Sequence, residues 1–207
     1  MNSNIHRPGL LAVPVLCALL VSTPAAAQSV PPGADWTHGT RLNLFAGAST
    51  DSSTTGPYLG GGVGWGIKPT FAIEGTMGWI DRPGADTSAY NAALKAQYFL
   101  PVGKVAPYAA GGFGLYRASF GAGSEMPEFY SRRVSATDPG LTAPKTFTDP
   151  AFIFGGGVNF QLSRHLALRP DVEVMMVFDD SHNYWVTGVA VHFAYHFEDH
   201  PVTPFRR

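Results

Sequence analysis

Six charged residues stand at alternate positions within otherwise apolar stretches, and they are the best candidates for a functional cluster. They are the basic residues Arg41, Lys95 and Arg169 and the acidic residues Glu74, Asp171 and Glu173. The three positive and three negative charges sum to zero. Charges persist in a protein interior only when they are paired, and removing one partner of a buried pair costs roughly 3–5 kcal/mol. If these side chains share one interior, they can form an ion-pair network.

Such a network has two interpretations. In the first, the paired charges plug the interior and hold it shut. In the second, they form a gate, which opens a path for small solutes when the pairs exchange partners. We favour the plug, because the eight-stranded barrel that the sequence predicts (see below) is filled by its own side chains.

The histidines suggest a metal site, but their spacing argues against one. His192 and His196 lie four residues apart in a predicted strand, and four residues of strand span ~13 Å, so one ion cannot reach both. The only cysteine is Cys17, within the predicted targeting segment, and no other thiolate is available. We therefore predict no metal site and no cofactor.

One short segment has the residue types of a hydrolase. Asp179-Asp180-Ser181-His182-Asn183 contains a hydroxyl, an imidazole and carboxylates. Hydrolysis needs a serine, a histidine and an acid that converge in space. Ser181 directly precedes His182 in a predicted turn, which is a poor arrangement for this purpose. We predict a protein that is not an enzyme, and keep hydrolysis as an alternative.

Strands position all of these residues, because apolar residues recur at every second position. The pattern is clearest between 152 and 197, where the charged residues within the strands occupy the face opposite the apolar one. It predicts eight strands, at 37–48, 56–67, 70–80, 87–100, 106–117, 152–162, 166–178 and 184–197. The one long polar loop is expected at 118–150. Pro170 cannot donate a backbone hydrogen bond, so we expect a bulge there.

The outward face of these strands is suited to lipid. Charged residues make up 14% of the chain, against ~25% in soluble domains. Connections after the first, third and fifth strands are longer than those after the second, fourth and sixth, as in barrels that cross a membrane. No segment after residue 27 could form a spanning helix, so a closed barrel is the remaining way to satisfy the backbone in lipid. A lipocalin-like barrel is the alternative, but its outside would need a polar coat that neither face provides.

The first 27 residues have the features of a signal peptide. Arg7 precedes an apolar core, Gly9–Val21, and Ala25-Ala26-Ala27 forms a cleavage site. We expect a signal peptide at 1–27, a loose leader at 28–35, the barrel at 36–197 and a periplasmic tail at 198–207. The net charge of −1 does not favour nucleic acid as a partner.

A weak internal repeat consists of glycine-rich strands. Pro57-Tyr58-Leu59-Gly60-Gly61-Gly62-Val63-Gly64 is similar to Pro107-Tyr108-Ala109-Ala110-Gly111-Gly112-Phe113-Gly114. We interpret these glycines as spacers in a narrow lumen or as sites of sharp curvature. A phosphate cradle is the alternative, but neither the spacing nor a following helix supports it.

These repeats, together with Gly155–Phe160, Leu166–Glu173 and a last strand ending at Phe197, resemble the OmpA-like, opacity-type outer-membrane β-barrels. The resemblance covers about residues 36–197. It implies an all-β, eight-stranded, antiparallel, up-and-down transmembrane barrel in the bacterial outer membrane, with both termini in the periplasm. It carries almost no information about activity.

The resemblance also defines the expected partners and functions. Outer-membrane lipid, lipopolysaccharide and the barrel-assembly machinery are expected partners, together with an unknown surface ligand. Arg132 and Arg133 in the long loop are candidate contacts for lipopolysaccharide phosphates, a host surface or a neighbouring protein; a charge-balanced mobile loop is the favoured alternative. The leading function is a non-enzymatic envelope or surface-interaction barrel. A narrow solute pore is second, and a lipid A-modifying enzyme that uses Ser181 and His182 is third.

Overall fold

The computed structural model describes residues 39–51, 54–68, 70–82, 87–100, 105–134, 142–163, 165–179 and 182–197. The predicted signal peptide, leader and tail lie outside these ranges and stay predictions, as does Ser181.

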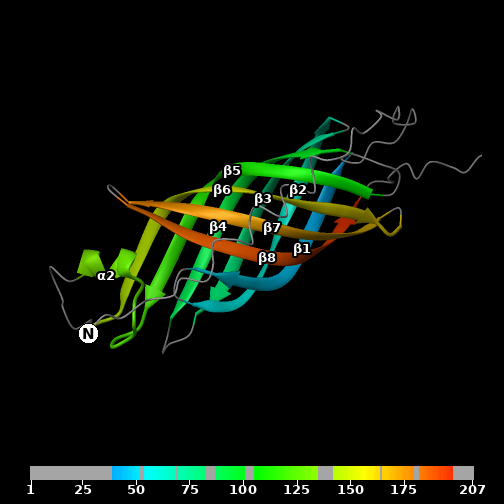
Figure 1. The fold of residues 1–207 in the computed structure, drawn as a ribbon. Coiled ribbons are helices and arrows are strands. Elements are labelled where there is room, and N and C mark those ends of the chain that lie inside the picture. Colours follow the sequence, from blue (N-terminus) through cyan, green and yellow to red (C-terminus); the bar gives the residue numbers. More distant parts are fainter. Residues whose placement is uncertain are drawn as a thin grey trace, which may run out of the picture. The chain divides into compact units, whose positions relative to one another are not determined.

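Eight strands form a closed antiparallel barrel, in which each strand pairs with the next and β1 pairs with β8 (Figure 1). This confirms the predicted up-and-down topology. The strands are β1 Thr40–Thr50, β2 Thr55–Lys68, β3 Phe71–Asp81, β4 Ser88–Phe99, β5 Val105–Phe120, β6 Lys145–Gln161, β7 Leu166–Asp179 and β8 His182–His196. In the described ranges, no helix has both the length and the apolar character to cross a membrane.

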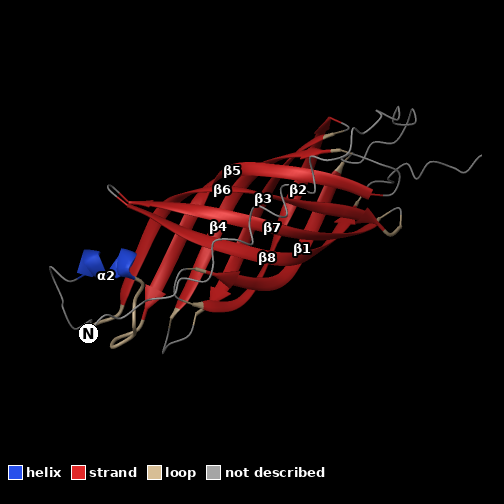
Figure 2. Cartoon of the chain, viewed as in Figure 1, coloured by secondary structure: helices blue, strands red, loops and turns tan. Residues whose placement is uncertain are grey.

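The barrel has two distinct ends. At the first, here called the turn end, β1 begins, β8 ends, and β2–β3, β4–β5 and β6–β7 are connected. At the other, here called the loop end, β1–β2, β3–β4, β5–β6 and β7–β8 are connected. The helix α2, Glu128–Val134, lies between β5 and β6 in the chain and therefore belongs to the loop end (Figure 2).

Side chains alternate between the interior and the outside along every strand, as the sequence predicts. In β8, Tyr184, Val186 and His192 are buried while the residues beside them in sequence are more exposed. The exposed large apolar residues cover the outside of all eight strands: Leu42, Leu44, Leu59, Trp65, Ile67, Met77, Tyr90, Leu94, Tyr98, Phe113, Leu115, Phe154, Phe160, Leu166, Trp185, Val189, Val191, Phe193 and Tyr195. Such a belt is the surface that a barrel presents to lipid.

The long loop is shorter than the sequence predicts, and it is not all loop. β5 continues to Phe120 and β6 begins at Lys145, where these two residues are still paired. The expected range of 118–150 is therefore wrong by several residues at each end. The added strand residues are mostly polar or small, so their alternation was too weak to recognise. β5 and β6 have 16 and 17 residues, more than the ~9–11 needed to cross a bilayer.

The bulge expected at Pro170 is also absent. In the described strands, Gly157 pairs with Asp171 and Phe160 with Leu168 in one unbroken register. On the other side, Pro170 pairs with Val191 without any shift. Near Pro170 the pairing between β6 and β7 is interrupted, but neither strand contains an extra residue. The register shift that does occur lies between β2 and β3, at Gly66 and Lys68.

The interior has three layers. A small apolar cluster of Ala72, Phe99, Ala106 and Tyr108 fills the turn end. A larger cluster, which includes Phe45, Tyr58, Tyr116, Ile153 and Met175, fills the loop-end half. Charged side chains lie between them. Many large apolar residues therefore share the inward positions with the charged side chains.

Candidate functional site

The interior charges converge on Glu74 of β3, a side chain with 0% exposure. Arg169 of β7 binds it with both terminal nitrogens, Nη1 to Oε2 at 2.8 Å and Nη2 to Oε1 at 2.9 Å. This two-pronged geometry is the strongest arrangement for a guanidinium and a carboxylate. Because β3 and β7 lie on different sides of the barrel, the pair spans the lumen.

Three further side chains donate to the same carboxylate. Arg41 Nη2 lies 3.3 Å from Oε2, and Asn43 also donates to Oε2. Gln97 Nε2 donates to Oε1 at 3.1 Å, while its own oxygen accepts from Arg41. Glu74 is thus surrounded by donors from β1, β4 and β7. A buried carboxylate with this many donors is compensated for the loss of water.

Lys95 of β4 joins the second acidic residue to this centre. Its Nζ forms an ion pair with Glu173 and lies 3.7 Å from Glu74 Oε1. Glu74 and Lys95 are direct neighbours across β3 and β4. Because both side chains point inward, the pairing of these two strands is enough to bring them together. Lys95 is the one charged group of the six within ion-pair distance of both glutamates.

Asp171 is held by a separate set of partners. Tyr108 Oη donates to Asp171 Oδ2 at 2.6 Å, and His192 Nε2 lies 3.0 Å from the same oxygen. Arg169 Nη2 lies 3.0 Å from His192 Nδ1. A guanidinium can only donate, so Nδ1 must accept and Nε2 must carry the proton. His192 is therefore a neutral link that connects Arg169 to Asp171.

The site as a whole is a charge-neutral, cross-lumen network. Its six charged members are all buried, and each contacts an opposite charge or a neutral link. Arranged in this way, the network can seal the barrel and, through its charged members, fix the positions of β1, β3, β4 and β7. In the described residues, no group of three or more His, Cys, Asp or Glu side chains could hold a metal ion. His192 and His196 are both buried.

Inward glycines make room for the large side chains of the interior. A Cβ on Gly64 would lie 2.5 Å from Arg41 Nε. A Cβ on Gly78 would lie 2.4 Å from Tyr58 Cε2 and from Asn91 Oδ1, and one on Gly60 would lie 2.3 Å from Phe45 Cζ. At Gly60 and Gly64, which belong to the repeat, these contacts agree with the interpretation of the glycines as spacers in a narrow lumen.

At the loop end, α2 is held against the barrel by Arg133. The guanidinium contacts both oxygens of Asp149 at 2.9 Å, lies 3.5 Å from Asp179 Oδ2, and covers the ring of Phe147. Tyr130 and Val134 are the buried residues of the helix. A seven-residue helix is not stable alone, so this docking sustains it.

Arg132, the other predicted surface contact, points away from this docking interface. Its side chain is 52% exposed and pairs with Glu128 one turn earlier. The hydrogen bond from Arg132, followed by its charge, lowers the pKa of Glu128. Contact of Arg132 with an external ligand stays a prediction, while the guanidinium of Arg133 is engaged within the chain.

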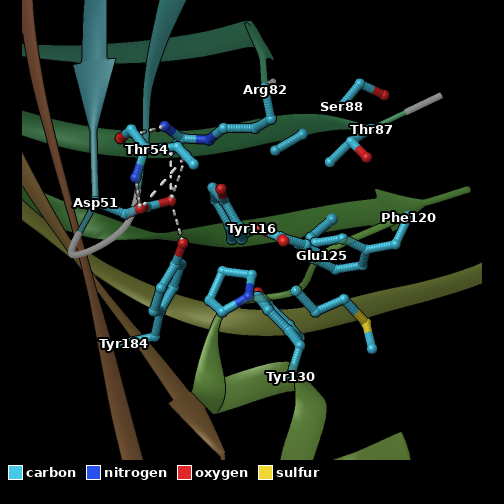
Figure 3. A pocket seen from close by; sticks show the side chains of 14 residues that line it. Asp51, Thr54, Arg82, Thr87, Ser88, Tyr116, Phe120, Glu125, Tyr130 and Tyr184 are labelled. Atoms are coloured by element: carbon cyan, nitrogen blue, oxygen red, sulfur yellow. Dashed lines mark hydrogen bonds and ion pairs between the residues drawn. The ribbon is translucent and has the colours of Figure 1, made fainter. Parts of the chain in front are cut away.

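A second polar cluster lies at the loop end (Figure 3). Arg82 donates to the backbone oxygens of Ser49 and Thr54 at 3.2 and 3.4 Å, and lies 3.5 Å from Asp51 Oδ2. Tyr184 donates to the same carboxylate. The cluster borders a cavity of about 200 Å³ between the strand ends and α2.

Sequence reasoning found the six charged members of the network but missed its neutral ones. The alternation of each strand places these neutral residues on the inward face, and that position was the only sign of their role. They are Asn43, Gln97, Tyr108 and His192. The cluster of Asp51 and Arg82 was missed because both residues follow strand ends. There the alternation of side chains no longer predicts which way a residue points.

Comparison with known proteins agrees with this architecture. The model of the outer membrane protein beta-barrel domain family matches residues 13–197, most of the chain. The protein belongs to this family. It is therefore an outer-membrane protein. No curated protein matches the sequence.

Solved structures show the same fold at low sequence identity. Neisserial surface protein A superimposes with a TM-score of 0.57 at 13% identity, over 76% of this chain and 96% of that one. The N-terminal barrel domain of Pseudomonas aeruginosa OprF gives a TM-score of 0.52 at 10% identity, over 77% and 99%. Because the identities are this low, the similarity of this outer-membrane barrel to both proteins concerns the fold alone.

Proposed function

We propose that this outer-membrane barrel is not an enzyme, that its own side chains plug its lumen, and that it serves envelope structure or interaction at the cell surface. The observation that carries the proposal is the cross-lumen pair of Arg169 and Glu74, which is fully buried and held by further donors from β1 and β4. A pair of this kind obstructs the lumen at its own level.

The apolar layer on the loop-end side of the network supports the same function. Phe45 contacts both Tyr58 and His192, with ring centroids 4.8 and 4.7 Å away. Tyr116, Ile153 and Met175 fill the same half of the barrel. A solute would have to displace both an ion-pair layer and an apolar layer to pass.

Conductance in a planar lipid bilayer tests the plug. Refolded protein that shows heat-modifiable migration on a gel should give little current, while a porin in the same bilayer provides the positive control. Regular current steps from the wild-type protein would contradict the proposal.

A narrow solute pore is the second candidate, and the position of Lys95 favours it. Its ammonium group pairs with Glu173 and lies within 3.7 Å of Glu74, so a small movement would exchange its partner. If the wild type conducts, a Lys95→Met variant should alter the fraction of time that the pore is open. Unchanged gating would exclude Lys95 as the moving group.

The lipid A-modifying function has less support. His182 is exposed at the start of β8, and Ser181 lies outside the described residues. Mass spectrometry of lipid A from cells that express the wild type or His182→Ala would test it. A mass change that the substitution abolishes would establish enzymatic activity and contradict the leading proposal.

Export and surface contact complete the proposal. We infer that the signal peptide is cleaved, so the form isolated from the outer membrane should begin at Gln28 when its N-terminus is sequenced. The apolar belt contacts lipid, and the loop end is available to lipopolysaccharide.

A further inference from the structure

The loop end contains a small cavity that neither the plug nor the apolar belt requires. It has a volume of about 200 Å³ and lies between the ends of β1 and β5, the starts of β4 and β8, and the segment leading into α2. Figure 3 shows Tyr116, Tyr130 and Tyr184 around it, with Asp51 and Arg82 on one side. An apolar cavity of ~150 Å³ is enough for benzene, so this one can hold a ligand with a single ring.

The charges of the cavity wall select for a cation. Asp51 and Arg82 lie within ion-pair distance of each other, so their charges largely cancel. Glu125 also lines the cavity, is exposed, and has no ion-pair partner among the described residues. The wall therefore carries one negative charge that no neighbouring side chain balances.

A buried hydroxyl without a partner marks the polar part of the site. Tyr130 is 1% exposed, lines the cavity, and its Oη has no hydrogen-bond partner in the part of the chain that the structure describes. In Figure 3 its ring extends from α2 toward the side of the cavity where Tyr116 lies. Burial raises the pKa of this hydroxyl, so it keeps its proton at neutral pH. An orphaned polar group of this kind costs free energy, which a ligand could recover.

Aromatic and apolar side chains supply the remaining wall. Phe120 and Met126 line the cavity together with the tyrosines, and the rings of Phe120 and Tyr130 lie 5.2 Å apart. Aromatic faces attract organic cations and bind flat apolar rings. The wall thus combines an unbalanced carboxylate, aromatic surface and one unused hydroxyl.

We propose that this cavity binds a small organic cation, in which an ammonium group and a hydroxyl are carried by one aromatic ring. The ammonium group pairs with Glu125 at the rim, the ring packs against Phe120 and Met126, and the hydroxyl exchanges a hydrogen bond with Tyr130. No covalent step is involved. The site is separate from the lumen network, so it does not depend on whether the barrel conducts.

Three ligands of one shape test the proposal. Tyramine carries both the charge and the hydroxyl, tyrosol replaces the ammonium group with a neutral alcohol, and phenethylamine lacks the ring hydroxyl. Binding is followed by NMR chemical-shift titration of the full mature protein in detergent micelles. Tyramine should bind most tightly, by about threefold over tyrosol for a partly solvated charge and by about fivefold over phenethylamine for one hydrogen bond.

Two variants connect these differences to the residues. Glu125→Gln should remove the preference for tyramine over tyrosol, and Tyr130→Phe the preference over phenethylamine. Because the Tyr130 hydroxyl has no partner, its removal should leave folding intact, which the gel shift verifies. Glu128→Gln is the matched control, since this exposed carboxylate of α2 does not line the cavity, and it should leave all three affinities unchanged.

Several results would overturn the proposal. Tyrosol binding as tightly as tyramine would remove the charge selection. Shifts spread over the outward-facing residues would indicate partition into the micelle instead of a site, and the absence of saturable shifts at millimolar tyramine would exclude this ligand class. Equal losses for Glu128→Gln and Glu125→Gln would show that any carboxylate near α2 has the same effect.

Discussion

Arg169 and Glu74, 95 residues apart in the chain, face each other across the lumen and share two hydrogen bonds of 2.8 and 2.9 Å. Arg169 also donates to His192, so one guanidinium connects the two halves of the interior network. Its loss should therefore affect the whole layer.

Replacing Arg169 by leucine should destabilise the barrel by roughly 3–5 kcal/mol, because Glu74 is left buried with less compensation. Urea unfolding in lipid vesicles measures this loss. The double variant Arg169→Leu/Glu74→Gln should recover part of it, since the uncompensated carboxylate is then neutralised while the amide oxygen still accepts from Arg41. If the loss in the double variant equals the sum of the losses in Arg169→Leu and Glu74→Gln alone, the two residues are not coupled.

Gly78→Ala should cost ~1–3 kcal/mol from overpacking. The added methyl would lie 2.4 Å from both the Tyr58 ring and Asn91 Oδ1. Gly75→Ala, in the same strand, is the control, because its Cβ would meet no atom within 4 Å. Unfolding midpoints of the two variants in one detergent provide the comparison. Equal midpoints would mean that the inward glycines are not needed as spacers.

Arg133→Ala should release α2 from the loop end without unfolding the barrel. The substitution removes the contacts with Asp149, Asp179 and Phe147. Hydrogen exchange in Glu128–Val134 should accelerate, while the gel shift of the barrel stays as in the wild type. Arg132→Ala is the adjacent control and should change the exchange rates little, because this side chain is 52% exposed and its ion pair with Glu128 lies within the helix.

The charge state of Glu128 should depend on Arg132. The hydrogen bond lowers the pKa of Glu128 below its ordinary value, so its contribution to α2 is present above that ordinary pKa and is lost as pH falls through the lowered one. In Arg132→Ala, NMR titration of the carboxyl carbon should show the pKa of Glu128 rising toward the ordinary value. The same titration curve in both proteins would show that the pair does not form in solution.

The boundaries of the elements were only partly predictable. Sequence reasoning ended the fifth strand at Arg117, whereas Phe120 still pairs with Lys145. At those last pairs the outward positions of β5 hold the polar residues Arg117 and Ser119, so the apolar outward face that identified the strands ends there although the backbone ladder continues. Pro170 was also misjudged. It interrupts the pairing of β7 with β6 without shifting the register, because the unbroken ladder to β8 holds β7 in place.

The sequence by itself determined the fold and the inward direction of the six charges, because both follow from a local property: successive side chains of a strand point to opposite faces. Only the tertiary structure decided which inward residues meet. Glu74 lies within ion-pair distance of all three basic residues, and barrel closure brings Arg169 from the far wall into the two-pronged pair. The docking of α2, the cluster of Asp51 and Arg82, and the cavity beside Tyr130 were also decided there. They form where chain segments from different strand ends converge, and no local pattern records that convergence.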